Sequence, residues 1–271
     1  MNNEAIGVFD SGLGGLTTVK VLNEILPNEN IVYLGDTARV PYGTRSKDTI
    51  YKYAKQDISF LLTHNVKMII VACGTVSSIM MSKPVYDGDV PFTGVLLPAV
   101  QTACCKTKSG KIGVIGTPAT IRSNGYGKAI RSINPEMSVI GKACPMFVPL
   151  VENGYTDRNN KVTKLIAEEY LSVMKKEKVD TLILGCTHYP IIKDIIADYM
   201  GDDVALISPG EEAAKYVASH LASNKLLADR TEKGKNNFYV TDTTEMFARS
   251  CSIFLGTDVK ESVEKCNLED Y

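Results

Sequence analysis

Short apolar runs alternate with amphipathic helical segments along most of this 271-residue chain. The runs expected to form strands are residues 5–9, 31–34, 67–72, 111–115, 180–184 and 238–240. Between them, apolar residues recur near the helical period, as at Leu16, Val19, Leu22 and Leu26. Helices are expected to begin near residues 13 and 74, to end near residue 62, and to cover residues 161–175 and 191–199. A last helix is expected between a capping-box sequence at residues 242–245 and Gly256. This alternation predicts an α/β fold with mainly parallel sheets flanked by helices.

The chain also repeats itself. Residues 6–12 (IGVFDSG) resemble residues 112–118 (IGVIGTP), and residues 67–75 (KMIIVACGT) resemble residues 179–187 (VDTLILGCT). The two pairs occur in the same order and at similar spacing, which favours an internal duplication over chance. If the two repeats form two similar domains, Cys73 and Cys186, which occupy matching positions in residues 67–75 and 179–187, would face each other.

Cys73 and Cys186 each follow an expected strand and precede an expected helix. Ligands of open α/β sheets bind beyond the carboxyl ends of strands, and a helix N-terminus lowers the pKa of a thiol. Either cysteine taken alone is better interpreted as a small core residue. Their matched settings favour a functional pair. The other cysteines lack this setting and are expected to be structural or incidental; they are Cys104, Cys105, Cys144, Cys251 and Cys266.

Three polar residues stand near these positions. His188, two residues after Cys186, could tune that thiol or could cap or pack a helix. Asp10, at the end of the first strand, and Glu152 could hold an ammonium group or assist proton transfer. Alternatively, Asp10 is a helix cap and Glu152 a surface acid. The glycine-rich turn at residues 11–15 lacks the spacing of a phosphate loop and is better suited to holding a carboxylate.

Charge and composition exclude several classes of function. The net charge is −1 and the pI is about 6.3, so a nucleic-acid partner is not expected. No apolar stretch is long enough to span a membrane, and the N-terminus does not have the pattern of a signal peptide. Three histidines without zinc-site spacing indicate no metal site. Seven cysteines without a CxxC pair are typical of a reducing compartment, so a cytoplasmic location is expected.

Four segments together resemble the glutamate racemases of the aspartate/glutamate racemase superfamily. They are residues 7–17 (GVFDSGLGGLT), 33–43 (YLGDTARVPYG), 71–73 (VAC) and 184–190 (LGCTHYP). The resemblance implies interconversion of L- and D-glutamate without pyridoxal phosphate, another cofactor or a metal, and a role of D-glutamate in peptidoglycan synthesis. It also implies two domains, residues 1–97 with 208–271 and residues 98–207, with the active site in the cleft between them. A homodimer is possible on the same grounds.

The resemblance further implies roles for individual residues. Cys73 would act on the D-enantiomer and Cys186 on the L-enantiomer, with Asp10, Glu152 and His188 supporting the thiols. The residues expected to contact the substrate are Asp10, Ser11, Tyr42, Gly43, Gly74, Thr75, Thr187 and His188. The chain departs from the family at Gly74, where asparagine is usual. That change leaves both thiols in place but removes one side-chain contact to the substrate.

Two other functions remain compatible with the sequence. One is an aspartate racemase or a related acidic amino-acid racemase, which the loss of the usual asparagine at Gly74 favours. The other is a regulatory protein that keeps the fold without catalysis, which the paired thiols argue against.

Overall fold

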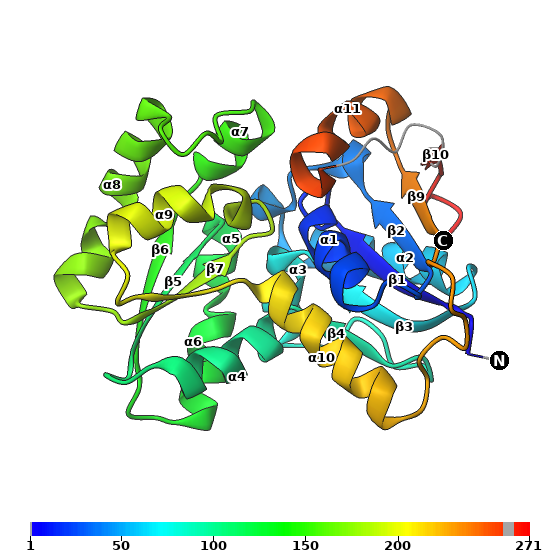
Figure 1. The fold of residues 1–271 in the computed structure, drawn as a ribbon, viewed down its shortest axis with the longest axis horizontal. Helices are drawn as coiled ribbons and strands as arrows, with labels where there is room; N and C mark the ends of the chain where they lie inside the picture. Colours follow the sequence, from blue (N-terminus) through cyan, green and yellow to red (C-terminus); the bar gives the residue numbers. More distant parts are fainter. Residues whose placement is uncertain (1, 257–262) are drawn as a thin grey trace.

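The computed structural model describes residues 2–256 and 263–271, which build two parallel β-sheets that lie side by side (Figure 1). The first sheet has the strand order β10-β9-β2-β1-β3-β4. Its strands are β1 (Ala5–Asp10), β2 (Ile31–Gly35), β3 (Val66–Val71), β4 (Phe92–Gly94), β9 (Asn236–Val240) and β10 (Val263–Lys265). The second sheet has the order β6-β5-β7-β8. Its strands are β5 (Lys111–Gly116), β6 (Ser138–Ala143), β7 (Thr181–Gly185) and β8 (Ala205–Ile207). The expected α/β class with parallel sheets is confirmed.

Helices cover the faces of both sheets (Figure 1). The helices near the first sheet are α1 (Leu16–Ile25), α2 (Lys47–Leu62), α3 (Gly74–Met80) and α11 (Thr244–Leu255). Those near the second are α5 (Pro118–Ser123), α6 (Gly125–Ile133), α7 (Phe147–Glu152), α8 (Lys161–Glu177) and α9 (Lys193–Met200). Helices α4 (Leu96–Lys106) and α10 (Pro209–Ser223) pack against each other where the chain passes between the two sheets. Three short 3-10 helices are η1 (Thr37–Arg39), η2 (Tyr42–Thr44) and η3 (Tyr189–Ile192). No helix in the described residues is long and apolar enough to cross a membrane.

The internal repeat reappears in the topology. The order β2-β1-β3-β4 in the first sheet matches β6-β5-β7-β8 in the second. Strands β1 and β5 are therefore equivalent, as are β3 and β7. Cys73 and Cys186 follow these last two strands, so each thiol lies beyond the carboxyl end of a central strand of its own sheet.

All six strands expected from apolar runs are present. Five of them, β1, β2, β3, β5 and β7, lie inside a sheet and are almost fully buried. The sixth, β9, lies next to the edge strand β10 and is only partly buried. The strands that the sequence did not reveal lie at or next to sheet edges. β4, β8 and β10 have three residues each, and every residue of β6 is at least partly exposed. An edge strand needs no continuous apolar run, so its pattern is weak.

Two local expectations need correction. The helix expected over residues 191–199 is divided into η3 and α9. Helix α11 does end at Gly256, but it begins one residue later than the capping box requires. Glu245 therefore occupies the second helical position instead of the third, and the N-cap residue Thr243 makes no side-chain capping bond.

Candidate active site

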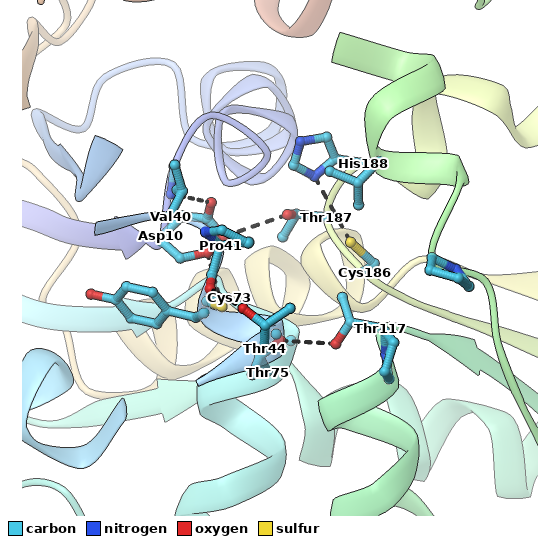
Figure 2. A pocket seen from close by; sticks show the side chains of 18 of the residues that line it. Asp10, Val40, Pro41, Thr44, Cys73, Thr75, Thr117, Cys186, Thr187 and His188 are labelled. Carbon is cyan, nitrogen blue, oxygen red and sulfur yellow. Dashed lines mark hydrogen bonds between the residues drawn. The ribbon is translucent and has the colours of Figure 1, made fainter. Parts of the chain in front are cut away.

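A cavity of about 360 Å³ lies between the carboxyl ends of the two sheets (Figure 2). Every site residue expected from the sequence lines it: Asp10, Ser11, Tyr42, Gly43, Cys73, Gly74, Thr75, Glu152, Cys186, Thr187 and His188. The lining comes from both halves of the repeat. In Figure 2, Cys73 lies with Asp10 on the side of the first sheet, and Cys186 lies with His188 on the other.

Cys73 is the N-cap residue of α3 and is only 4% exposed. Its Sγ donates to Ser11 Oγ at 3.4 Å. Burial and the nearby Asp10 carboxylate raise the pKa of this thiol to about 12, although Ser11 and the backbone N–H groups of α3 act in the opposite direction. The expectation of a lowered pKa is therefore wrong for Cys73, because desolvation outweighs the helix N-terminus.

Cys186 has a different environment. It follows β7 directly, but the next helix, η3, begins only at Tyr189, so the sulfur does not precede a helix as the sequence suggested. Its Sγ lies 3.8 Å from Nδ1 of His188. The equivalent thiols thus have unequal neighbours: a carboxylate and a hydroxyl beside Cys73, an imidazole beside Cys186.

His188 joins Cys186 to Glu152. Its Nε2 lies 3.0 Å from Oε1 of Glu152, which is the last residue of α7. Burial disfavours the charged imidazolium, but the hydrogen bonds and charges of Cys186 and Glu152 outweigh it and raise the pKa of His188 to about 10. A positive charge therefore stands beside Cys186 at neutral pH. Glu152 is no isolated surface acid, although its side chain is 45% exposed.

This arrangement predicts a pH-dependent contribution to stability. Because the folded-state pKa of His188 is raised, its contribution is complete below about pH 6.5 and is lost as the pH rises through about 10. The substitution His188→Gln should therefore lower the free energy of unfolding by roughly a few kcal/mol at pH 6 and by much less near pH 10. Urea unfolding at both pH values measures the difference. His220→Gln, on α10, is the control, and an equal loss from His188→Gln at both pH values would contradict the charge assignment.

Asp10 lines the cavity and is 1% exposed. Its Oδ1 accepts from the backbone N–H of Gly12 at 2.9 Å, and its Oδ2 accepts from Thr187 Oγ1 at 3.4 Å. Burial raises the pKa of the Asp10 carboxyl, while His188 and these hydrogen bonds hold it down. The Thr187 bond crosses from one half of the repeat to the other, so Asp10 helps to align the two sides of the cavity.

Tyr42 and Gly43 reach the cavity on the segment between β2 and α2. The Tyr42 hydroxyl points away from a substrate position, toward the buried carboxylates of Asp36 and Asp57. Tyr42 lines the cavity although it is only 1% exposed. Gly43 lies against Thr117 of the second half.

Gly74 and Gly14 lie where the two halves approach each other closely. A Cβ at Gly74 would lie 2.5 Å from the carbonyl oxygen of Gly185, the residue before Cys186. A Cβ at Gly14 would lie 2.1 Å from Thr187 Oγ1. Thr75, next to Gly74, has its Oγ1 3.1 Å from Thr117 Oγ1 (Figure 2). These contacts bring the strand ends that carry the two thiols together.

Several lining residues were not expected from the sequence. They include Val40, Thr44, Thr117, Cys144, Val148 and Pro149. Thr117 could have been identified, because the repeat aligns it with Ser11. Cys144 was expected to be incidental, yet it lines the cavity as a fully buried thiol. Nothing local in the sequence distinguishes it, because only the packing of the second sheet brings it there.

Comparison with known proteins agrees with this geometry. A family model described as Asp/Glu/hydantoin racemase matches residues 6–217. A glutamate racemase of Geobacter metallireducens is 46% identical over 253 residues, which are 93% of each chain. A solved structure of glutamate racemase from Francisella tularensis subsp. tularensis SCHU S4, in complex with D-glutamate, superposes with a TM-score of 0.91 at 42% identity, covering 100% of both chains. A glutamate racemase isoform of Bacillus anthracis superposes with a TM-score of 0.93 at 35% identity, covering 99% of both. By this identity and coverage, the chain belongs to the Asp/Glu/hydantoin racemase family and, within it, to the glutamate racemases.

Proposed function

We propose that the protein interconverts L- and D-glutamate by proton transfer between two thiols. The observation that carries this proposal is the placement of Cys73 and Cys186 at equivalent strand ends of two sheets, on either side of one cavity. Inversion at an α-carbon requires a base on one face and an acid on the other. Relatives named glutamate racemase, 41–46% identical to this chain, support glutamate as the substrate.

The unequal neighbours of the two thiols suggest how the reaction starts. The imidazole of His188 lies 3.8 Å from the Cys186 sulfur, whereas the pKa of Cys73, about 12, keeps that sulfur protonated at neutral pH. Cys186 would then remove the α-proton of L-glutamate, and Cys73 would deliver its proton to the opposite face to form D-glutamate. Afterwards Cys186 is a thiol and Cys73 a thiolate. Proton exchange with solvent then converts Cys186 back to the thiolate and Cys73 back to the thiol, which restores the starting form of the enzyme.

The carbanion formed between these steps needs stabilisation. The residues after Asp10 and at the start of α3 line the cavity, and we propose that backbone N–H groups there bind the substrate carboxylate as it gains charge. Asp10 and Glu152 bring negative charge suited to the substrate ammonium group. We further propose that residues 1–97 with 208–271 and residues 98–207 act as two domains that close around the substrate and exclude water.

In this proposal the thiols perform the proton transfer without pyridoxal phosphate or a metal. The D-glutamate formed would supply peptidoglycan synthesis, as the family resemblance implies. A dimer of the chain is compatible with this role and is not required by it, because all proposed site residues belong to one chain.

Racemisation in deuterium oxide tests the two-base reaction. Each turnover should place deuterium at the α-carbon of the product, while the substrate remaining early in the reaction keeps its proton. ¹H NMR with circular dichroism follows both quantities from L- and from D-glutamate. Product that retains the original proton would indicate a single base and would contradict the proposal.

Aspartate is the competing substrate in the same assay. Family members usually have an asparagine at the position of Gly74, and its side chain contacts the substrate. Because glycine lacks that side chain, the preference for glutamate over a related acidic amino acid such as aspartate has to be measured. The proposal requires kcat/KM for glutamate to exceed that for aspartate. The reverse order would reassign the substrate without changing the chemistry, and no turnover of either acid would favour a non-catalytic protein.

A further inference from the structure

Behind the wall of the cavity, two buried carboxylates flank the hydroxyl of Tyr42. Asp36 directly follows β2, and Asp57 lies on α2; both side chains are fully buried. The Tyr42 hydroxyl is hydrogen-bonded to Asp36 Oδ2 and also lies 3.1 Å from Asp57 Oδ2. Neither acid lines the cavity, so neither belongs to the proposed proton-transfer machinery.

The single proton of the Tyr42 hydroxyl favours an arrangement in which one of these carboxyls also carries a hydrogen. A tyrosine hydroxyl has a single proton and can donate it fully to only one acceptor. Two ionised carboxylates on either side of the hydroxyl would leave one close oxygen–oxygen contact without a hydrogen. If one acid is protonated, both contacts become hydrogen bonds, because that acid donates to the tyrosine oxygen.

The other donors are distributed unequally between the two acids. Asp36 accepts from Arg39 Nε at 2.6 Å and from Thr241 Oγ1 at 2.9 Å, in addition to Tyr42. Apart from its contact with the Tyr42 hydroxyl, Asp57 accepts a longer bond from Arg39 Nη2, at 3.2 Å. The donors therefore converge on Asp36, which is the better place for a buried negative charge.

The charges around the pair agree with this assignment. Burial and the charge of Asp36 raise the pKa of Asp57 well above its usual value, although Arg39 acts against them. Asp10, also buried, raises it further. Cys266 is a further titratable group that interacts with both acids. Arg39 can neutralise one carboxylate, so a second ionised acid would leave an uncompensated buried charge.

The hydrogen-bonded group is connected directly to the cavity wall. Tyr42 lies in the middle of residues 40–44, all of which line the cavity. Val40 at one end of this segment packs against Gly12, and Gly43 lies against Thr117. The segment therefore contacts the walls of both halves, and the Tyr42 hydroxyl is its buried anchor.

We propose that Asp57 is a protonated positioning residue: its carboxylic acid donates to Tyr42, Tyr42 donates to ionised Asp36, and this relay holds residues 40–44 in the shape that receives the substrate. The relay rests on the proposed function, because it assigns residues 40–44 to substrate binding. Asp57 acts through Tyr42 and does not touch the substrate.

The matched substitutions Asp57→Asn and Asp36→Asn test the relay. An asparagine at position 57 can donate to Tyr42 and accept from Arg39 just as the protonated acid does, so KM for glutamate should change by less than about threefold. An asparagine at position 36 removes a buried charge that Arg39 needs, so KM should rise at least about tenfold with a smaller change in kcat. Tyr42→Phe should raise KM in the same way, because it interrupts the relay.

Infrared spectroscopy supplies a readout that is independent of catalysis. The wild-type protein should show a carbonyl stretch of a protonated carboxylic acid at neutral pH that is absent in Asp57→Asn, and a wild-type protein without this band would overturn the relay. An Asp57→Asn variant that loses this band but also fails to fold, or that raises KM as much as Asp36→Asn, would overturn the relay. A wild-type protein with the band but without racemase activity would instead refute the proposed function and leave the proton assignment intact.

Discussion

Replacing either Cys73 or Cys186 by alanine is expected to lower the rate of glutamate racemisation by about 10⁴-fold, the upper end of what one acid–base group contributes. Each half of the reaction needs one sulfur as base and the other as acid, so neither can substitute for its partner. The two sulfurs enter the cavity from different sheets, and no single thiol can reach both faces of the α-carbon. Polarimetry or circular dichroism at saturating glutamate measures the loss.

The two variants should differ in the exchange that they retain. Cys73→Ala keeps the thiol proposed to act on L-glutamate, so it should exchange the α-proton of L-glutamate with deuterium oxide without forming D-glutamate. Cys186→Ala should exchange only D-glutamate. ¹H NMR of each pure enantiomer distinguishes these cases, because exchange removes the α-proton signal while optical rotation stays constant.

Cys144→Ala is the matched control. This third thiol also lines the cavity, but its Sγ lies 3.7 Å from the backbone oxygen of Lys142, toward which it donates. The variant should remain an active racemase. A Cys186→Ala protein with full activity, or a Cys144→Ala protein as inactive as the other two, would show that the pair has been wrongly assigned.

Replacing Gly74 by asparagine should decrease kcat by about 10²-fold, even though asparagine is the residue that the family resemblance leads one to expect. A Cβ at this position would lie 2.5 Å from the Gly185 carbonyl oxygen, against an ordinary contact of at least 3.4 Å. The backbones would have to separate by roughly 1 Å, a displacement that can cost 10²-fold when it affects reacting groups. Gly74 follows Cys73 and Gly185 precedes Cys186, so the separation would move the two thiols apart.

Gly74→Ala should produce most of the same loss, because the clash begins at Cβ. Gly141→Ala on β6 is the control, since a Cβ there meets its nearest neighbour at an ordinary 3.4 Å. Steady-state kinetics of the three variants, with circular dichroism to confirm folding, decides the question. An unchanged or increased kcat in Gly74→Asn would show that the two halves separate without cost.

Much of the fold could be predicted because the central strands have an unambiguous pattern. Strands β1, β3 and β7 are buried on both faces, so apolar residues occupy nearly every position. The edge strand β6 could not be predicted, since it is partly exposed throughout. The cysteine pair was visible for the same reason as the central strands, because each cysteine ends one of them.

The sequence by itself determined that two similar strand-and-helix units exist and that each ends a central strand with a cysteine. Those properties depend on local periodicity and on an internal repeat, both of which can be recognised in the sequence alone. Only the tertiary structure decided the electrostatics of the thiols. Desolvation and Asp10 raise the pKa of Cys73, whereas Cys186 lies beside His188. His188 in turn contacts Glu152, which α7 brings from a distant part of the chain. Burial and through-space charge depend on residues far apart in sequence, so equivalent positions in the repeat acquire unequal chemistry only when the two halves pack together.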